Sequence, residues 1–311
     1  MDTPNTSPSY LLAFDGSEHS RAAVELLHDI CGSTESPRKI AVHLLTVFTP
    51  RQIKDHHILS TNLAHTKQYL EDKGCFEVSA DLILGYPSEK ILEFAEYIKP
   101  NMILLGARGL RATLGILLGG VAQHVVEYSY WPVLVTRAPY KKLERVLLAI
   151  DSSPYSKQAV NHLKKLILPG DIKISVLHVL SPLPSETTPV YVSEIWPIIA
   201  DQIPTPISVP GQAEEEIAWL EEEKNRGQEL LDFATAELIA SGRDATPVLL
   251  RGDAATEIIK FSKDNNVDLI ISGSRGLSRL QGFFIGSVSR KLVHYANRSV
   301  LIVKTPAINT D

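Results

Sequence analysis

Short apolar runs alternate along the chain with segments whose apolar residues recur at helical spacing. In the first half, the apolar runs predict strands at 10–14, 40–48, 77–84, 102–105 and 131–136. The helical spacing predicts helices at 20–31, 56–73 and 88–98. Strands that alternate with helices form parallel βαβ units, so the pattern predicts an α/β fold. The strands are almost continuously apolar, which predicts that helices cover both faces of the sheet.

The second half of the chain repeats this order. Strands are predicted near 146–150, 172–179, 245–250, 268–272 and 299–303, and helices near 153–167, 213–241, 254–265 and 286–296. Three glycines of the first half, at positions 106, 109 and 119, recur 167 residues later. The first strand of each half ends in an aspartate, Asp15 or Asp151, and this pair is separated by only 136 residues. Such self-similarity indicates two copies of one unit.

The repeat predicts two tandem doubly wound α/β domains, at residues 1–138 and 144–306. The boundary is placed near Ala138–Leu143, which is short, polar and contains a proline. The two repeat offsets differ by 31 residues, so the second domain carries an insert within about 181–216. This stretch holds seven prolines, which exclude a regular helix or a central strand. We expect the insert to be a long loop over one face of the second domain.

Charge and composition argue against nucleic acids and membranes as partners. The 311 residues carry a formal net charge of -5, so no strong basic field is present to hold nucleic acid. No apolar run approaches the length of a membrane span, and the first residues do not resemble a signal peptide. Cys31 and Cys75 belong to no CxxC pair and are expected to be buried thiols. We therefore expect a cytoplasmic protein without nucleic-acid or membrane partners.

The residues that carry chemistry gather at predicted strand ends. Asp151 ends the first strand of the second domain and Gly273 ends its fourth, so both border the crevice in which α/β sheets bind ligands. Gly273 and Gly276 are followed by nine residues and then by Gly286, which opens a helix. Glycine turns and helix N-termini present backbone N–H groups to phosphate. Ser287 and Ser289 would add hydroxyl donors, and Asp151 would accept hydrogen bonds from a ribose or a base.

This spacing, together with the aspartate that ends the first strand, resembles the universal stress protein family, and the two copies resemble its tandem members. The resemblance implies a five-stranded parallel sheet in each domain, of the Rossmann-like or adenine nucleotide α-hydrolase-like type. It also implies that the domains pair through their last strands, 132–136 and 299–303, which would hide both of these sheet edges. Some members bind ATP, so ATP or another adenine nucleotide is the expected ligand, and an accompanying magnesium ion is left open. Carried over to this sequence, the implied nucleotide contacts are Asp151, Ile174, Gly273, Arg275, Gly276, Gly286, Ser287, Val288 and Ser289.

The first domain departs from the motif at two positions. Gly120 stands where the second domain has Ser287, and Ala122 stands where it has Ser289. Each lost hydrogen bond to a charged group costs about 1.5–3 kcal/mol, so we expect the second domain to bind nucleotide more tightly. A second, weaker site would consist of Asp15, Val42, Gly106, Arg108, Gly109, Gly119, Gly120 and Val121.

Structural interpretations compete with each of these assignments. The glycines could serve only tight turns, the two aspartates could cap the following helices, and Arg108 and Arg275 could be solvated loop residues. His43 and His178 lie in strand-like runs and are expected to be hydrogen-bonded core residues. The adjacent pair His56-His57 lacks the spacing and partners of a metal site, so neither a metal ligand nor a catalytic residue is assigned.

Three functions therefore remain open from the sequence. The first is a nucleotide-binding regulator of the stress response, the second a slow ATPase, and the third a nucleotide-free scaffold that binds a protein partner or another small molecule. Whether the chain forms a homodimer is also open.

Overall fold

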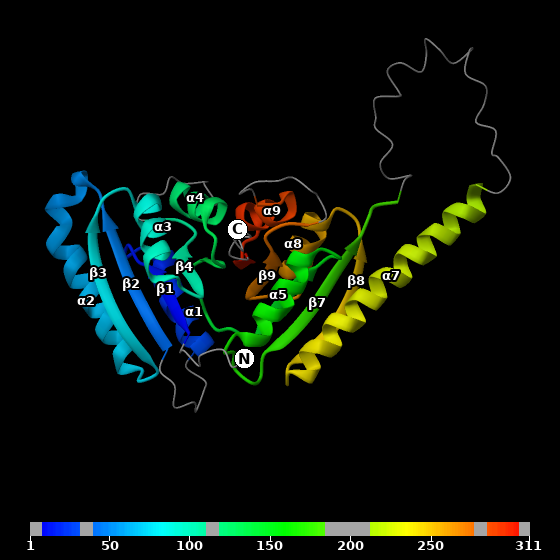
Figure 1. The fold of residues 1–311 in the computed structure, drawn as a ribbon, viewed down its shortest axis with the longest axis horizontal. Coiled ribbons are helices and arrows are strands. Elements are labelled where there is room, and N and C mark those ends of the chain that lie inside the picture. The colour runs from blue at the N-terminus through cyan, green and yellow to red at the C-terminus, as the bar shows by residue number, and fades with distance from the viewer. Residues whose placement is uncertain (1–7, 32–39, 110–117, 184–211, 277–284, 305–311) are drawn as a thin grey trace, which may run out of the picture.

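The computed structural model describes residues 8–31, 40–109, 118–183, 212–276 and 285–304. Its ten strands form one sheet in the order β3-β2-β1-β4-β5-β10-β9-β6-β7-β8, with the two halves of the chain side by side (Figure 1). The first half supplies β1 (Ser9–Ala13), β2 (Ile40–Phe48), β3 (Phe76–Leu84), β4 (Met102–Gly106) and β5 (Val133–Thr136). The second half supplies β6 (Arg145–Ile150), β7 (Lys173–Leu180), β8 (Asp244–Arg251), β9 (Leu269–Gly273) and β10 (Ser299–Val303). Within each half all five strands are parallel, which confirms the predicted fold class.

Helices cover both faces of the sheet because the strand residues are apolar on both sides. One face packs against α1 (Glu18–Cys31), α2 (His56–Asp72), α5 (Pro154–Lys165) and α7 (Gln212–Ala240). The other packs against α3 (Pro87–Ile98), α4 (Gly120–Tyr128), α8 (Ala254–Asp264) and α9 (Ser287–Tyr295). A short 3-10 helix, η1 (Pro50–Asp55), precedes α2. Both apolar layers include residues of both halves, so the two domains share a continuous core.

The halves are joined at their last strands, as predicted. β5 and β10 run antiparallel, with Leu134 opposite Leu301. This pairing covers one edge of each five-stranded sheet and leaves β3 and β8 as the outer strands. Pro247 lies within β8. A proline cannot donate to a further strand, so it protects this edge from pairing with another chain.

Two equivalent cations tie each domain to a helix of the other. Arg137 follows β5, and its Nη2 donates to the carbonyl oxygen of Val293 at the end of α9 (2.7 Å). Lys304 follows β10, and its Nζ donates to the carbonyl oxygens of Glu127 (3.1 Å) and Ser129 (2.8 Å) at the end of α4. Cations at helix C-termini satisfy orphan carbonyls and oppose the helix dipole. Burial, and secondarily the charge of Arg275, lowers the pKa of Lys304 to about 8.

Replacing Lys304 with methionine is expected to weaken this joint. The change removes two hydrogen bonds from a charged donor, while relief from burying the ammonium offsets part of the loss. We expect the free energy of unfolding to fall by about 1.5 kcal/mol, the lower end of the range for such bonds. Urea denaturation checks this, with Lys260→Met on the exposed side of α8 as the control. Equal stability of the two variants would refute the capping role.

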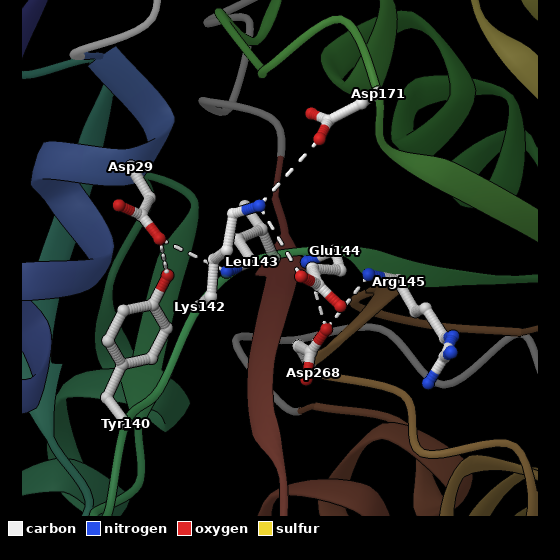
Figure 2. A network of polar contacts seen from close by, with 8 residues as sticks. All are labelled: Asp29, Tyr140, Lys142, Leu143, Glu144, Arg145, Asp171 and Asp268. Carbon is white, nitrogen blue, oxygen red and sulfur yellow. Dashed lines mark hydrogen bonds and ion pairs between the residues drawn. The ribbon is translucent and has the colours of Figure 1, made fainter.

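The segment between β5 and β6 is fixed to both domains (Figure 2). On the first domain, the Asp29 carboxylate accepts hydrogen bonds from the Tyr140 hydroxyl (2.5 Å) and the Leu143 N–H (3.1 Å). On the second, the Asp268 carboxylate accepts from the N–H groups of Glu144 (3.0 Å) and Arg145 (2.9 Å). Burial and the bond to Asp29 raise the pKa of the Tyr140 hydroxyl. The predicted boundary at 138–143 falls in this anchored segment.

His162 on α5 makes stability depend on pH. Its Nε2 is buried and has no hydrogen-bond partner in the part of the chain that the structure describes. Burial, and secondarily Lys165, lowers its pKa from 6.5 to about 4. Below about pH 6.5 the unfolded chain takes up a proton that the folded chain resists, so stability falls with falling pH.

The expected loss attributable to His162 is about 2 kcal/mol between pH 7 and pH 5. Urea denaturation at both pH values measures it, and in His162→Leu this part of the loss should disappear. The exposed His57→Leu is the control and should keep the loss of the unmodified chain. An identical pH dependence in all three proteins would contradict the assignment.

Three expectations about local structure need correction. Helix α4 was not predicted, although its N-cap Gly119 corresponds to Gly286, the N-cap of α9. The predicted insert ends earlier than expected, because Gln212 already begins α7. Residues 184–211 of the insert lie outside the described residues. Cys75 is half-buried rather than buried, and the side chain of Cys31 is not among those described.

Candidate functional site

The Asp151 carboxylate is held at the end of β6 by the start of α5. Its Oδ1 accepts hydrogen bonds from the Ser153 N–H (3.0 Å) and the Ser156 hydroxyl (2.6 Å). The N-cap of α5 is Ser153, whose own hydroxyl accepts from the Ser156 N–H. Asp151 is therefore not the helix cap that one interpretation of the sequence allowed. Its second oxygen, Oδ2, faces the glycine loop.

The loop after β9 approaches this carboxylate closely. A Cβ added to Gly276 would lie 2.8 Å from Asp151 Oδ2. A Cβ on Gly286 would lie 3.2 Å from the Cα of Arg275. Glycine at these two positions therefore lets the loop fold back against both the aspartate and itself. The Ser153 hydroxyl donates to the Arg275 carbonyl oxygen (3.3 Å), which ties the loop to α5.

Helix α9 begins at this loop with its N–H groups uncapped by a side chain. Its N-cap is Gly286, which has no side chain to offer. In contrast, the caps of α5 and α8 are Ser153 and Asp253, each of which accepts a hydrogen bond from its own helix. The first N–H groups of a helix have no partner within it and attract anions. The start of α9 can therefore receive a phosphate.

These features line one cavity of about 260 Å³ at the carboxyl ends of the strands. The structure brings eight of the nine predicted contacts to its wall: Asp151, Gly273, Arg275, Gly276, Gly286, Ser287, Val288 and Ser289. Ser287 is exposed at the first turn of α9, where its hydroxyl can reach a ligand. The Arg275 guanidinium lies 5.8 Å from the centre of the Tyr155 ring, so it is partly stacked rather than only solvated.

Two of these residues also have a structural role within the protein. A Cβ on Gly273 would lie 2.8 Å from the main-chain carbon and oxygen of Tyr155, so this glycine allows α5 to pack on β9. Gly106 has the same role against α1 in the first domain. Ser289 is 3% exposed and its hydroxyl donates to the Gly273 carbonyl oxygen at 2.7 Å. Of the two serine hydroxyls expected to donate to a phosphate in the second domain, only that of Ser287 therefore remains available.

The predicted contacts on the second strand of each domain must be corrected. Ile174 pairs with Val146 at the start of β6, and it lies in the core rather than on the cavity wall. Val42 pairs with Tyr10 and is equally remote from the cavity of the first domain. The wall residues at these strand ends are Val179 and Val47. In each domain the second strand runs parallel to the first, and the first strand ends just before the aspartate. Aligning the ends of these two strands could have located Val179 and Val47.

Histidine 178 also lines the cavity, which the sequence did not predict. Its Nδ1 lies 2.9 Å from the Ile150 carbonyl oxygen and therefore carries a proton, because a carbonyl oxygen can only accept. The expected hydrogen bond is present, but both strand histidines are only half-buried, so neither is the core residue that was expected. His43, the other strand histidine, lies 2.8 Å from the Ser79 hydroxyl.

The first domain repeats the arrangement with a larger cavity of about 460 Å³. The structure brings seven of the eight predicted contacts to its wall: Asp15, Gly106, Arg108, Gly109, Gly119, Gly120 and Val121. A Cβ on Gly109 would lie 2.6 Å from Asp15 Oδ2, as in the second domain. Arg108 Nε lies 3.1 Å from His19 Nε2. The Gly120 position is open, since an added Cβ would meet nothing within 4 Å.

The fold and the two strand-end cavities define a tandem doubly wound α/β protein with a glycine-loop site in each domain. The family model of the universal stress protein family matches residues 10–137 and 142–304, so the chain belongs to that family.

Known proteins agree with this assignment. Universal stress protein YxiE of Bacillus subtilis is 31% identical over 160 residues, which are 51% of this chain and 98% of that protein. A universal stress protein of Mycolicibacterium smegmatis is 27% identical over 214 residues, 66% of this chain and 62% of that protein. The crystal structure of a universal stress protein from Archaeoglobus fulgidus matches with a TM-score of 0.61 and 21% identity, over 96% of this chain and 99% of that one. At this identity the last comparison shows the fold alone.

Two features are absent from the residues that the structure describes. They contain no group of three or more histidine, cysteine, aspartate or glutamate residues arranged to hold a metal ion. Among them, no helix combines the length and apolar character needed to cross a bilayer.

Proposed function

We propose that the protein is an adenine-nucleotide-binding regulator of the stress response, and that ATP binds in the cavity of the second domain. The observation that carries the proposal is the convergence of Asp151, the glycine loop and the start of α9 on one cavity. A carboxylate accepts hydrogen bonds from ribose hydroxyls, and an uncapped helix start receives phosphates. Both partners are present here at the switch point of a parallel sheet.

A nucleotide fits this cavity because two positions on its wall, 276 and 286, are glycines, which have no side chain. At position 276 there is no room for a Cβ beside Asp151, so a glycine is required there. At position 286 a glycine leaves the first N–H groups of α9 without a side-chain cap. Ser287 would donate its hydroxyl to a phosphate oxygen, and Val179 would contact the base. If magnesium accompanies the nucleotide, Asp151 is the carboxylate on this wall, and phosphate oxygens would supply further ligands.

The second domain is expected to bind ATP more tightly than the first. The expected difference in affinity comes from one hydroxyl, that of Ser287, because the first domain has Gly120 at the equivalent position. The Ser289 hydroxyl donates to the Gly273 carbonyl oxygen and does not contribute. Loss of one hydrogen bond to a charged group corresponds to about one to two orders of magnitude in affinity.

The experiment is to purify the chain without added nucleotide, denature it, and quantify the released small molecules by chromatography and mass spectrometry. We expect an adenine nucleotide at about one per chain. Preparations that release none are dialysed against labelled ATP and should then take it up. A chain that is empty and also fails to take up ATP would overturn the proposal in favour of the nucleotide-free scaffold.

ATP turnover measured in the same samples tests the remaining alternative. A rate well above background that disappears in Asp151→Ala would identify a slow ATPase. A rate at background, with nucleotide bound, agrees with a regulator.

A further inference from the structure

The cavity of the first domain differs from its counterpart at the end of the second strand. Thr46 and His178 occupy equivalent positions, because each bonds to the carbonyl oxygen of the residue before the aspartate that follows the first strand of its domain. Thr46 Oγ1 donates to the Phe14 oxygen (2.7 Å), while His178 Nδ1 lies 2.9 Å from the Ile150 oxygen. Both side chains line their cavities. Threonine makes the same bond with a smaller side chain, which is consistent with a volume of about 460 Å³ against about 260 Å³.

The wall of the larger cavity is predominantly apolar. It is formed in large part by Phe14, Leu45, Val47, Leu59, Ile91 and Leu118. The corresponding wall in the second domain instead includes four serines and a histidine: Ser156, Ser272, Ser287, Ser289 and His178.

Most polar side chains on the wall of the first cavity are bonded within the protein. The Thr46 hydroxyl donates to Phe14, as described above. The Gln52 side-chain oxygen accepts from both the N–H (3.0 Å) and the hydroxyl (2.9 Å) of Thr49, in the capping box of η1. Gly120 supplies no hydroxyl where the second domain has Ser287. Burial of apolar surface would therefore dominate binding here, whereas a triphosphate would find fewer donors.

We propose that the cavity of the first domain binds an uncharged, largely apolar small molecule in preference to a nucleoside triphosphate. The Asp15 carboxylate on its wall can accept a hydrogen bond from one N–H or O–H group of the ligand. Thr46 sets the specificity, because it leaves open the space that an imidazole fills in the second domain. The proposal does not rest on ATP binding in the second domain.

The test uses N-phenyl-1-naphthylamine, an uncharged fluorescent probe with one N–H donor and two aromatic groups. It is titrated into the full chain in the presence and absence of saturating ATP, with fluorescence as the readout. The first variant is Thr46→His, which gives the first cavity the side chain of the second. The matched control is His178→Thr, the reverse exchange.

We expect one probe molecule to bind per chain, with an affinity that ATP leaves unchanged. Thr46→His should weaken this binding by about tenfold, since it displaces apolar contact from the cavity. His178→Thr should keep the binding of the unmodified chain at this site. No binding, equal binding by Thr46→His, or competitive displacement by ATP would each overturn the proposal.

A second variant guards against a folding defect in Thr46→His. Val121 lines the cavity and is 37% exposed, so a larger side chain there can be accommodated at the surface. Val121→Trp should reduce probe binding while urea denaturation shows unchanged stability. A stable Val121→Trp that binds the probe normally would place the probe elsewhere and refute the assignment.

Discussion

Replacing Ser287 with leucine is expected to lower the affinity for ATP by about a hundredfold or more. The change removes a hydroxyl donor to phosphate, which alone corresponds to one to two orders of magnitude. It also places an apolar side chain at the first turn of α9, where the phosphates would lie. Ser287 is exposed, so leucine there should leave the fold intact. Isothermal titration calorimetry with ATP measures the effect.

The matched control is Gly120→Leu at the equivalent position of the first domain. Gly120 opens α4 as Ser287 opens α9, and an added Cβ there meets nothing within 4 Å. This variant should keep the affinity and the stoichiometry of ATP binding. If Gly120→Leu rather than Ser287→Leu abolished binding, the nucleotide would belong to the first domain.

Replacing Gly273 with valine is expected to lower the free energy of unfolding by about 3 kcal/mol or more. Its Cβ would lie 2.8 Å from main-chain atoms of Tyr155, and neither α5 nor β9 can move without disturbing the core. Overpacking a dense interior usually costs about 1–3 kcal/mol, and a contact with main chain belongs at the upper end. Urea denaturation followed by circular dichroism measures this loss.

Gly170→Val serves as the control, because an added Cβ at Gly170 meets nothing within 4 Å. This control should change stability much less than Gly273→Val. A Gly273→Val chain of normal stability that had lost ATP binding would contradict the packing role. It would instead restore the interpretation of Gly273 as a residue that makes room for phosphate.

The architecture was predictable because it depends on patterns that repeat along the chain. Apolar runs and the constant glycine offset were enough to predict two parallel α/β units, and the family resemblance implied that they pair through their last strands. The same offset relates α9 to α4, so the missed helix was within reach of the sequence. Its first residues, Gly119 and Gly120, have poor helix propensity, and only the comparison between the halves reveals their role.

The candidate site was predictable in its loops but not in its second strand. Asp151, Gly276 and Gly286 follow from motif spacing, because each occupies a turn whose length is fixed. Ile174 was misplaced because position along a strand depends on register with its neighbour, which spacing alone does not give. The role of Ser289 depends on a hydrogen bond to Gly273, sixteen residues earlier, and that contact exists only in the folded chain.

The most direct test of the central claim is photo-crosslinking of the full chain with 8-azido-ATP, followed by peptide mapping with mass spectrometry. The account predicts that labelled peptides come from the wall of the second cavity, that excess ATP suppresses the label, and that Ser287→Leu abolishes it. Label confined to the first domain, or label that excess ATP leaves unchanged, would contradict the assignment of the nucleotide to the second domain.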